Sequence, residues 1–171
     1  MRLFFSIDPP EQVQQQIHQL CPRLKGVRLM PADQLHITLQ FLDEQPSGII
    51  EDIAAAIAPL TLPDLMIRAD GINHFRSGVI WLRVLPDPKL TQLYKSLTYA
   101  LQQQQIHFQQ RNFIPHLTLA RCGKPVHSGA LEEFSRAFSQ QAFEFKPSPL
   151  RLKSSQLSPS GARHTIEAVF Y

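Results

Sequence analysis

Apolar and polar positions change their spacing several times along this 171-residue chain. Helical spacing marks residues 13–20, 49–60, 90–101 and 131–138. Short runs rich in β-branched and aromatic residues lie between these stretches and predict strands. The predicted strands cover residues 3–7, 27–30, 35–42, 65–69, 79–84, 113–121, 143–145, 150–152 and 165–171.

Two of the predicted helices begin with the same signal. Asp8-Pro9 and Asp87-Pro88 each place a capping carboxylate before a proline that suits the first helical turn. The order of helices and strands also repeats, because each half has a helix, a strand, a second helix and then further strands. The sequence therefore predicts an α+β fold that is bilobal and pseudo-two-fold duplicated. We expect two antiparallel sheets with helices on the outside, an active-site cleft between the sheets, and one domain over residues 1–171.

One tetrapeptide pattern, His-aliphatic-Thr-Leu, occurs in both halves. It appears as residues 36–39 and again as residues 116–119, each time inside a predicted strand. Because side chains alternate faces along a strand, each histidine shares a face with the threonine two residues later. If the halves pack against each other, two imidazoles and two hydroxyls converge on one anion. A phosphate group is the natural candidate.

Paired histidines suit the opening of a cyclic phosphodiester, because one group must accept a proton from water while another protonates the leaving oxygen. A zinc site would need three or four ligands, and the sequence has no HExxH, HxH or CxxC pattern to supply them. We therefore expect no metal and no other cofactor. The other histidines lack such companions and are interpreted as surface or loop residues: His18, His74, His107, His127 and His164.

Composition narrows the class of ligand and the location. The net charge of +3 is spread along the chain without a basic block, which argues against a protein that coats duplex nucleic acid. No apolar run is long enough to span a membrane, and the first residues do not form a signal peptide. Cys21 and Cys122 fit neither a CxxC motif nor a disulfide framework. A cytoplasmic monomer that binds a small phosphorylated ligand or an RNA end is the expectation.

The segments around both motifs resemble the two-histidine phosphoesterase superfamily, and specifically its bacterial and archaeal RNA 2′,3′-cyclic phosphodiesterase (2′-5′ RNA ligase) branch. The resemblance is carried by residues 35–42 and 115–121, together with residues 2–7, 79–82 and 155–161. It implies metal-independent hydrolysis of RNA-terminal 2′,3′-cyclic phosphate to a 2′-phosphomonoester. The substrates would be RNA 3′ ends, tRNA fragments among them, or nucleotides. Weak reversible 2′-5′ ligation would use the same groups.

Carried over residue by residue, the resemblance implies catalytic His36 and His116, with Thr38 and Thr118 binding the phosphate. We assign His36 as general acid and His116 as general base, although the sequence itself does not distinguish the two imidazoles. Arg121 matches a basic residue that faces the phosphate. Simple alternation places Arg121 on the opposite face from His116, so a bulge or strand end must redirect it.

Two departures from the family pattern concern the surroundings of the motifs. Asp43 stands where family members usually have glycine, and Leu29-Met30 replaces a common aromatic residue. Neither change removes a group that transfers protons. The alternative function is a non-catalytic RNA-end binding module that stacks a base on an aromatic residue, for which the candidates are Phe4, Phe5, Phe41 and Phe113. The paired acid–base groups favour the enzyme.

Overall fold

The computed structural model describes residues 1–123 and 126–171. The helices are α1 (Glu11–Leu20), α2 (Ile49–Ile57), α3 (Pro88–Gln103) and α4 (Ser128–Ala137), with a short 3-10 helix at Ala32–Gln34. The strands are β1 (Arg2–Ile7), β2 (Val27–Leu29), β3 (Ile37–Glu44), β4 (Ile67–Phe75), β5 (Val79–Val84), β6 (His116–Cys122), β7 (Ala142–Phe145), β8 (Leu150–Ser158) and β9 (Gly161–Phe170). The element types agree with the prediction from spacing.

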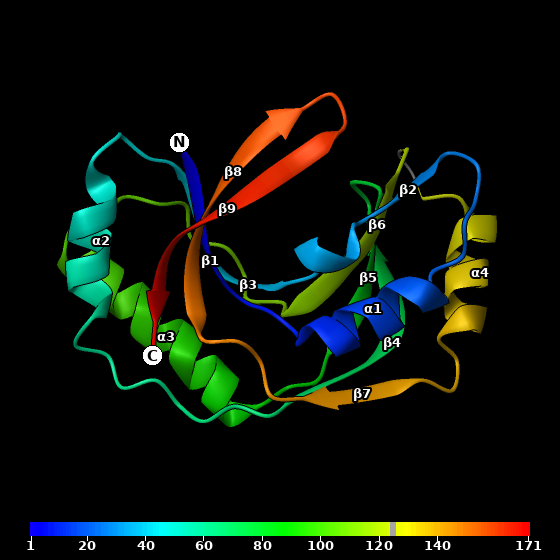
Figure 1. Cartoon of the computed structure of the whole chain (residues 1–171), viewed down its shortest axis with the longest axis horizontal. Helices are drawn as coiled ribbons and strands as arrows, with labels where there is room; N and C mark the ends of the chain where they lie inside the picture. Colours follow the sequence, from blue (N-terminus) through cyan, green and yellow to red (C-terminus); the bar gives the residue numbers. More distant parts are fainter. Residues whose placement is uncertain (124–125) are drawn as a thin grey trace.

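The described strands pair antiparallel throughout, in the order β7-β4-β5-β6-β3-β1-β8-β9, while β2 adds to β6. The predicted two sheets correspond to the two halves of this order. They join where β3 meets β6, at the register pair Ile37 and Leu117. The molecule is therefore bilobal, as predicted, but hydrogen bonding makes its two sheets continuous at the junction. Figure 1 shows the curled sheet with the two halves side by side.

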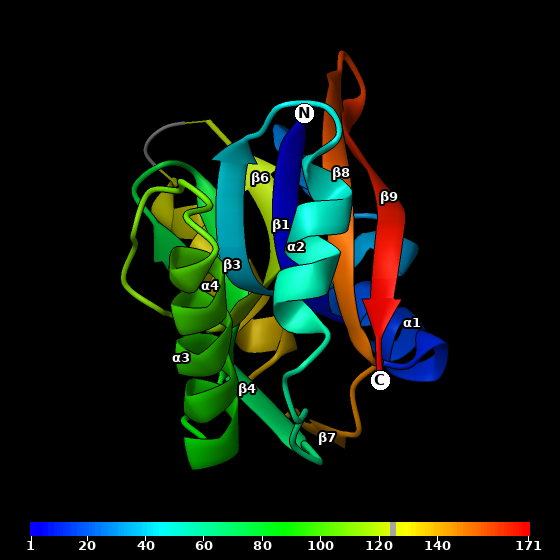
Figure 2. The ribbon, with the colours of Figure 1, turned by 90° about the vertical axis from the view of Figure 1, so that its left-hand side faces the viewer.

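The helices cover the outside of the sheet, two beside each half (Figures 1 and 2). Helix α3 packs on β3 and α2 packs on β9, whereas α4 packs on β4. Helix α3 follows β5 in the chain but covers the other half of the sheet, and α1 likewise follows β1 but lies beside the half that contains β6. Each half thus depends on a helix from elsewhere in the sequence, so that the two lobes share one connected core.

The two predicted helix caps have different outcomes. Asp87 caps α3, because its side chain accepts a hydrogen bond from the Leu90 amide and Pro88 occupies the first turn. The prediction for Asp8 is wrong: α1 begins at Glu11 after Pro10, without a side-chain cap. The Asp8 carboxylate instead lies buried among cations of β8. Tertiary charge pairing has replaced the local cap.

The strands of the C-terminal hairpin and β4 extend further than the sequence pattern predicts. Strands β8 and β9 form a long hairpin around residues 158–161, and β4 continues through Gly71 to Phe75 by way of a register shift. Gly71, which lies beyond the end of the predicted strand at residue 69, is therefore part of a strand. Among the helices of residues 1–123 and 126–171, none has both the length and the apolar character that crossing a membrane requires.

Candidate active site

The two motifs meet at the junction of the lobes. Ile37 and Leu117 are direct partners in the antiparallel β3–β6 pair. Extending this register by one residue on each side sets His36 beside Thr118 and Thr38 beside His116. All four side chains project from the face opposite to buried Ile37 and Leu117, and all four are partly exposed. We call this the motif face of the sheet.

This register makes the two histidines diagonal neighbours. Residues in such positions lie about 7 to 8 Å apart in an ordinary antiparallel pair, and their Cβ atoms are somewhat closer. The two imidazoles therefore leave from neighbouring positions of one face, as joint contact with a single anion requires. The arrangement has local two-fold symmetry, because each histidine faces the threonine of the other motif.

Both imidazoles are oriented in the same way. Nδ1 of His36 lies 2.7 Å from the Gln34 carbonyl oxygen, and Nδ1 of His116 lies 2.6 Å from the Ile114 carbonyl oxygen. A carbonyl oxygen only accepts, so each Nδ1 carries the proton and donates it. Nε2 is then the unprotonated nitrogen of each neutral ring. This pattern leaves Nε2 of both rings available for proton transfer.

Burial favours the neutral form of both imidazoles, because it lowers the pKa of each. The pKa of His36 is lowered to about 4, chiefly because burial disfavours the imidazolium, with Lys153 and His164 acting in the same direction. The Gln34 carbonyl and Asp8 oppose this shift. Burial also lowers the pKa of His116, and Arg121 adds to that effect while the Ile114 carbonyl opposes it.

A buried charge cluster lies next to His36. The carboxylate of Asp8 accepts hydrogen bonds from the Lys153 ammonium at 2.8 Å and from the Arg151 guanidinium at 2.6 Å, and the Ser6 hydroxyl donates to it at 3.1 Å. Asp8 and Lys153 are only 4% and 5% exposed. Burial alone would raise the pKa of Asp8, but these cations outweigh burial and lower it. The cluster thus adds net positive charge beside the first motif.

Of the two irregularities expected to redirect Arg121, a bulge or a strand end, the structure has the bulge. Ala120 pairs with Ile80 whereas Thr118 pairs with Trp81, so Leu119 is an extra residue in β6. The bulge returns Arg121 to the motif face, where its charge lowers the pKa of His116. Its role in binding phosphate stays a prediction.

Strand β3 contains a bulge at the corresponding position of the first motif. Ser6 pairs with Thr38 and Phe5 pairs with Gln40, which makes Leu39 the extra residue. In both motifs the bulge therefore falls directly after the threonine. The predicted internal duplication is not demonstrated by this likeness, but the shared irregularity fits it.

Aromatic rings pack against both histidines. The Phe4 ring centroid lies 5.1 Å from that of His36, and the Phe4 side chain is almost completely buried. His116 packs against Trp81 at 5.4 Å and against Phe75 at 5.1 Å. These contacts limit the rotation of the imidazoles, so that Nε2 of each ring keeps its direction.

His164 contacts His36, and the sequence did not reveal this neighbour. The interpretation of His164 as a surface or loop residue is wrong, because it lies in β9 with its ring centroid 5.1 Å from His36 and 5.0 Å from Phe4. Its Nδ1 is buried, and no described residue forms a hydrogen bond with it. No local pattern announces this position, because pairing of β8 with β1 and β9 brings it to the motif face.

The remaining histidines lie away from the motifs. His74 is exposed in β4 rather than in a loop, and His107 is exposed as predicted. His127 caps α4, since its Nδ1 accepts from the Ala130 amide. Nδ1 of half-buried His18 lies 3.0 Å from the Met30 carbonyl oxygen. These four histidines have structural or solvent contacts.

Asp43, which stands at the usual glycine position, organises the edge of the first motif. Its backbone adopts φ 57°, a left-handed value that favours glycine and is tolerated by aspartate. Its carboxylate pairs with Arg111 and accepts from the Gln109 amide. Arg111 in turn lies 5.0 Å over the Phe41 ring. Asp43 therefore holds the segment around Gln109 and Arg111, which precedes β6.

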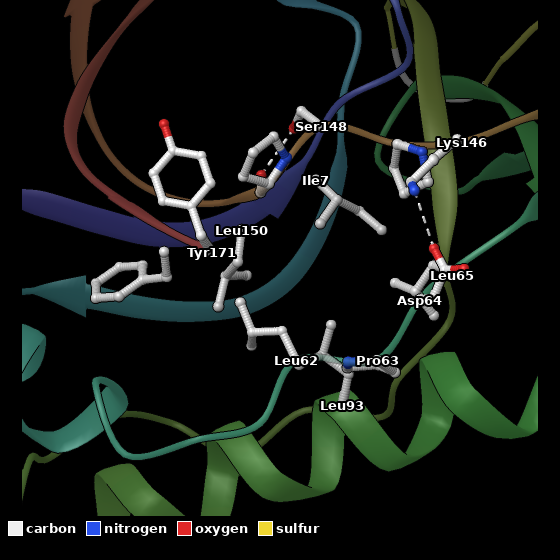
Figure 3. A pocket seen from close by; sticks show the side chains of 13 residues that line it. Ile7, Leu62, Pro63, Asp64, Leu65, Leu93, Lys146, Ser148, Leu150 and Tyr171 are labelled. Carbon is white, nitrogen blue, oxygen red and sulfur yellow. Dashed lines mark hydrogen bonds and ion pairs between the residues drawn. The ribbon is translucent and has the colours of Figure 1, made fainter.

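A separate pocket of about 410 Å³ lies elsewhere, between α3, residues 62–65 and the C-terminal residues. Figure 3 shows Leu93 and Leu150 in its wall, with the Asp64–Lys146 ion pair at one side and Tyr171 at another. None of the motif histidines or threonines lines it. Among the residues with described positions, no three His, Cys, Asp or Glu side chains are grouped so that they could hold a metal ion.

Comparison with solved structures shows where this fold occurs. A Thermus thermophilus protein aligns with a TM-score of 0.77 at 24% identity, over 99% of this chain and 97% of its own. Escherichia coli LigT complexed with 3′-AMP aligns with a TM-score of 0.75 at 24% identity, over 98% of this chain and 95% of its own. The fold is therefore that of LigT-like phosphoesterases.

Comparison with curated sequences and family models gives the same result. An RNA 2′,3′-cyclic phosphodiesterase from Methanocaldococcus jannaschii is 27% identical over 174 residues, which cover 97% of this chain and 98% of the relative. An Escherichia coli protein of the same name is 31% identical over 125 residues, covering 70% of this chain and 71% of the relative. The model of the 2′-5′ RNA ligase superfamily matches residues 9–152. The chain therefore belongs to the 2′-5′ RNA ligase superfamily.

Proposed function

We propose that this protein hydrolyses 2′,3′-cyclic phosphate at RNA ends, or on nucleotides, to a 2′-phosphomonoester. One observation carries the proposal: two imidazoles with carbonyl-bound Nδ1 atoms flank one small area of the motif face, each beside a threonine of the other motif. The curated relatives, which are named RNA 2′,3′-cyclic phosphodiesterase, support the choice of substrate.

In the proposed reaction a water molecule attacks phosphorus while one imidazole accepts its proton at Nε2. The bond between phosphorus and the 3′ oxygen breaks, and the other histidine, as imidazolium, donates its Nε2 proton to that oxygen. The products are a 2′-phosphomonoester and a 3′-hydroxyl. Hydroxyls of Thr38 and Thr118 donate to the non-bridging oxygens as charge grows on them, and Arg121 offsets the charge of the phosphate. No metal takes part in this proposal.

We assign the base to His116 and the acid to His36. Asp8 is the carboxylate whose charge favours the imidazolium of His36. Because the pKa of His36 is about 4 in the free protein, this assignment requires that the bound phosphate anion raise it. The opposite assignment uses the same atoms. A substrate whose leaving group needs no protonation distinguishes the two assignments.

The direct test is incubation of the purified protein with an oligonucleotide ending in a 2′,3′-cyclic phosphate, in the presence of a strong chelator. Conversion to the 2′-phosphorylated product supports the proposal, and the position of the phosphate is read by phosphorus NMR. Formation of a 3′-phosphate would contradict the proposed direction of opening. Activity that disappears with the chelator and returns with a metal ion would contradict metal independence.

The same experiment tests the non-catalytic alternative. If the protein binds the oligonucleotide but leaves the cyclic phosphate intact at high protein concentration, it is an RNA-end binding module. Ligation to a 5′-hydroxyl through a 2′-5′ linkage is the reverse of the proposed step. Hydrolysis should dominate because water vastly exceeds any 5′-hydroxyl in concentration.

A further inference from the structure

Two arginines lie directly opposite each other beside the proposed phosphate site. Arg28 of β2 and Arg121 of β6 are register partners, so their side chains project from the same face. Both are exposed, and neither forms an ion pair with a carboxylate of residues 1–123 or 126–171. Like charges placed directly opposite in a sheet repel each other. An anion bound between them would relieve that repulsion.

The C-terminal hairpin brings the other lobe to the same place. A Cβ atom on Gly161, at the turn between β8 and β9, would lie 3.5 Å from Cζ of Arg28. The Arg28 guanidinium therefore rests against the hairpin, although β2 belongs to the half of the sheet that contains β6. Figure 1 shows β2 and the hairpin turn on the same side of the molecule. The guanidinium bridges the two lobes at this end of the motif face.

His164 connects this basic pair with the catalytic region. It lies three residues after Gly161, and its ring contacts that of His36 edge-on at 5.1 Å. Unlike His36 and His116, it has no carbonyl partner at Nδ1 among the described residues. Its tautomer is therefore not set for proton transfer, whereas an Nε2–H can donate to a ligand. Arg121 is close enough for its charge to disfavour the His164 imidazolium and so to lower the pKa of His164, in addition to the larger effect of burial.

We propose that Arg28 and His164 form a second phosphate subsite, which binds the phosphate on the 5′ oxygen of the ribose that carries the cyclic phosphate. Arg121 lies between this subsite and the catalytic site and is shared by both phosphates. This inference rests on the proposed function and names the substrate class within it. The ring of His164, which belongs to this subsite, contacts the ring of His36. A single nucleotide can therefore reach from the catalytic site to the subsite. Paired guanidinium groups and a neutral imidazole donor are the groups that recognise a phosphate.

A 5′-linked phosphate occurs both in an RNA chain, as a phosphodiester, and in a mononucleotide that is phosphorylated at its 5′ oxygen. Three substrates separate these sources from the absence of a subsite. They are a nucleoside 2′,3′-cyclic phosphate with a free 5′-hydroxyl, its 5′-phosphorylated form, and a dinucleotide whose terminal ribose carries the cyclic phosphate. The parent protein should show a higher kcat/KM for both phosphorylated forms than for the first. A further preference for the dinucleotide identifies RNA chains as the source.

Arg28→Ala tests the subsite, with Arg163→Ala as the matched control. Arg163 is an exposed arginine adjacent to His164 in β9, but alternation turns its side chain to the opposite face. We expect Arg28→Ala to lower kcat/KM about tenfold for the phosphorylated substrates, the order of one charge-assisted hydrogen bond, and to leave the 5′-hydroxyl substrate unchanged. Arg28→Lys should restore part of the loss, and Arg163→Ala should have no effect.

Salt dependence provides an independent measurement. The slope of log kcat/KM against log salt for the dinucleotide should become shallower by about 0.7 in Arg28→Ala, the value of one lost phosphate contact on a single strand. An equal loss for all three substrates, or an equal loss in Arg163→Ala, would overturn the subsite. If no cyclic substrate is hydrolysed by the parent protein, the proposed function fails. Calorimetric binding of a dinucleotide 2′-phosphate to the parent and to Arg28→Ala then still decides the subsite, and equal affinities would exclude it.

Discussion

Ile37 and Leu117 are direct partners across β3 and β6, and both side chains are completely buried. This one register pair aligns the two motifs, because a shift by one residue would turn one histidine and its threonine into the core. The apolar residues of each motif thus determine where its polar residues lie. The core and the proposed chemistry depend on the same four-residue segments.

His36→Ala and His116→Ala should each lower kcat by about 10² to 10⁴, because each removes one proton-transfer group. The kcat of the double variant should be only slightly lower than that of the less active single variant, since the two groups act in one step. The measurement is steady-state hydrolysis of a nucleoside 2′,3′-cyclic phosphate, with circular dichroism to verify folding. His74→Ala, which changes an exposed histidine of β4, is the control. Losses that multiply in the double variant would show that the imidazoles act independently.

The acid and base roles can be separated by the leaving group. A 4-nitrophenyl phosphodiester releases a weakly basic phenolate that needs no protonation. If His36 is the acid, the loss in His36→Ala should shrink by about tenfold or more with this substrate, whereas the loss in His116→Ala should persist. Comparison of kcat/KM for the two substrates in both variants gives the answer. The reverse pattern would exchange the roles of the two residues.

The pH dependence of kcat/KM should be bell-shaped, with its maximum below the ordinary histidine pKa of about 6.5. Burial lowers the pKa of both imidazoles in the free protein, that of His36 to about 4. As the pH rises the acid loses its proton, and as the pH falls the base becomes protonated. The profile of kcat should lie at higher pH, because the bound phosphate anion favours the imidazolium. If kcat/KM did not change between about pH 4 and about pH 6.5, the result would contradict the proposed proton transfers.

Local patterns were sufficient to predict the helices, the motif strands and the shared face of each histidine and threonine. Alternation, together with the family resemblance, predicted a bulge or a strand end before Arg121, and the structure has a bulge there. The β3 bulge at Leu39 had no such signal, since no charged residue required it. The alternation of side chains therefore predicts a bulge only where the face occupied by a later residue of the same strand is already known.

The residues that the sequence did not reveal are those placed by long-range pairing. Asp8 has the local features of a helix cap, but the pairing of β1 with β8 presents Lys153 and Arg151 to it. His164 reaches His36 because β9 pairs with β8, which pairs with β1. The continuity of the sheet at Ile37 and Leu117 was equally invisible, because the two partners are 80 positions apart in the sequence.

Asp8 and Lys153 should contribute to the free energy of unfolding in a strongly non-additive way. Asp8→Asn leaves the Lys153 ammonium buried without its counter-charge and should lower the free energy of unfolding by about 3 kcal/mol. Lys153→Met should cost a similar amount, whereas the double variant should cost clearly less than the sum. The pKa of Asp8 is lowered on folding, so its contribution is complete above its ordinary value of 3.8 and disappears as the pH falls through the lower value of the folded state. Urea unfolding at neutral and acidic pH measures both effects, and additive losses would show that the two charges do not stabilise each other.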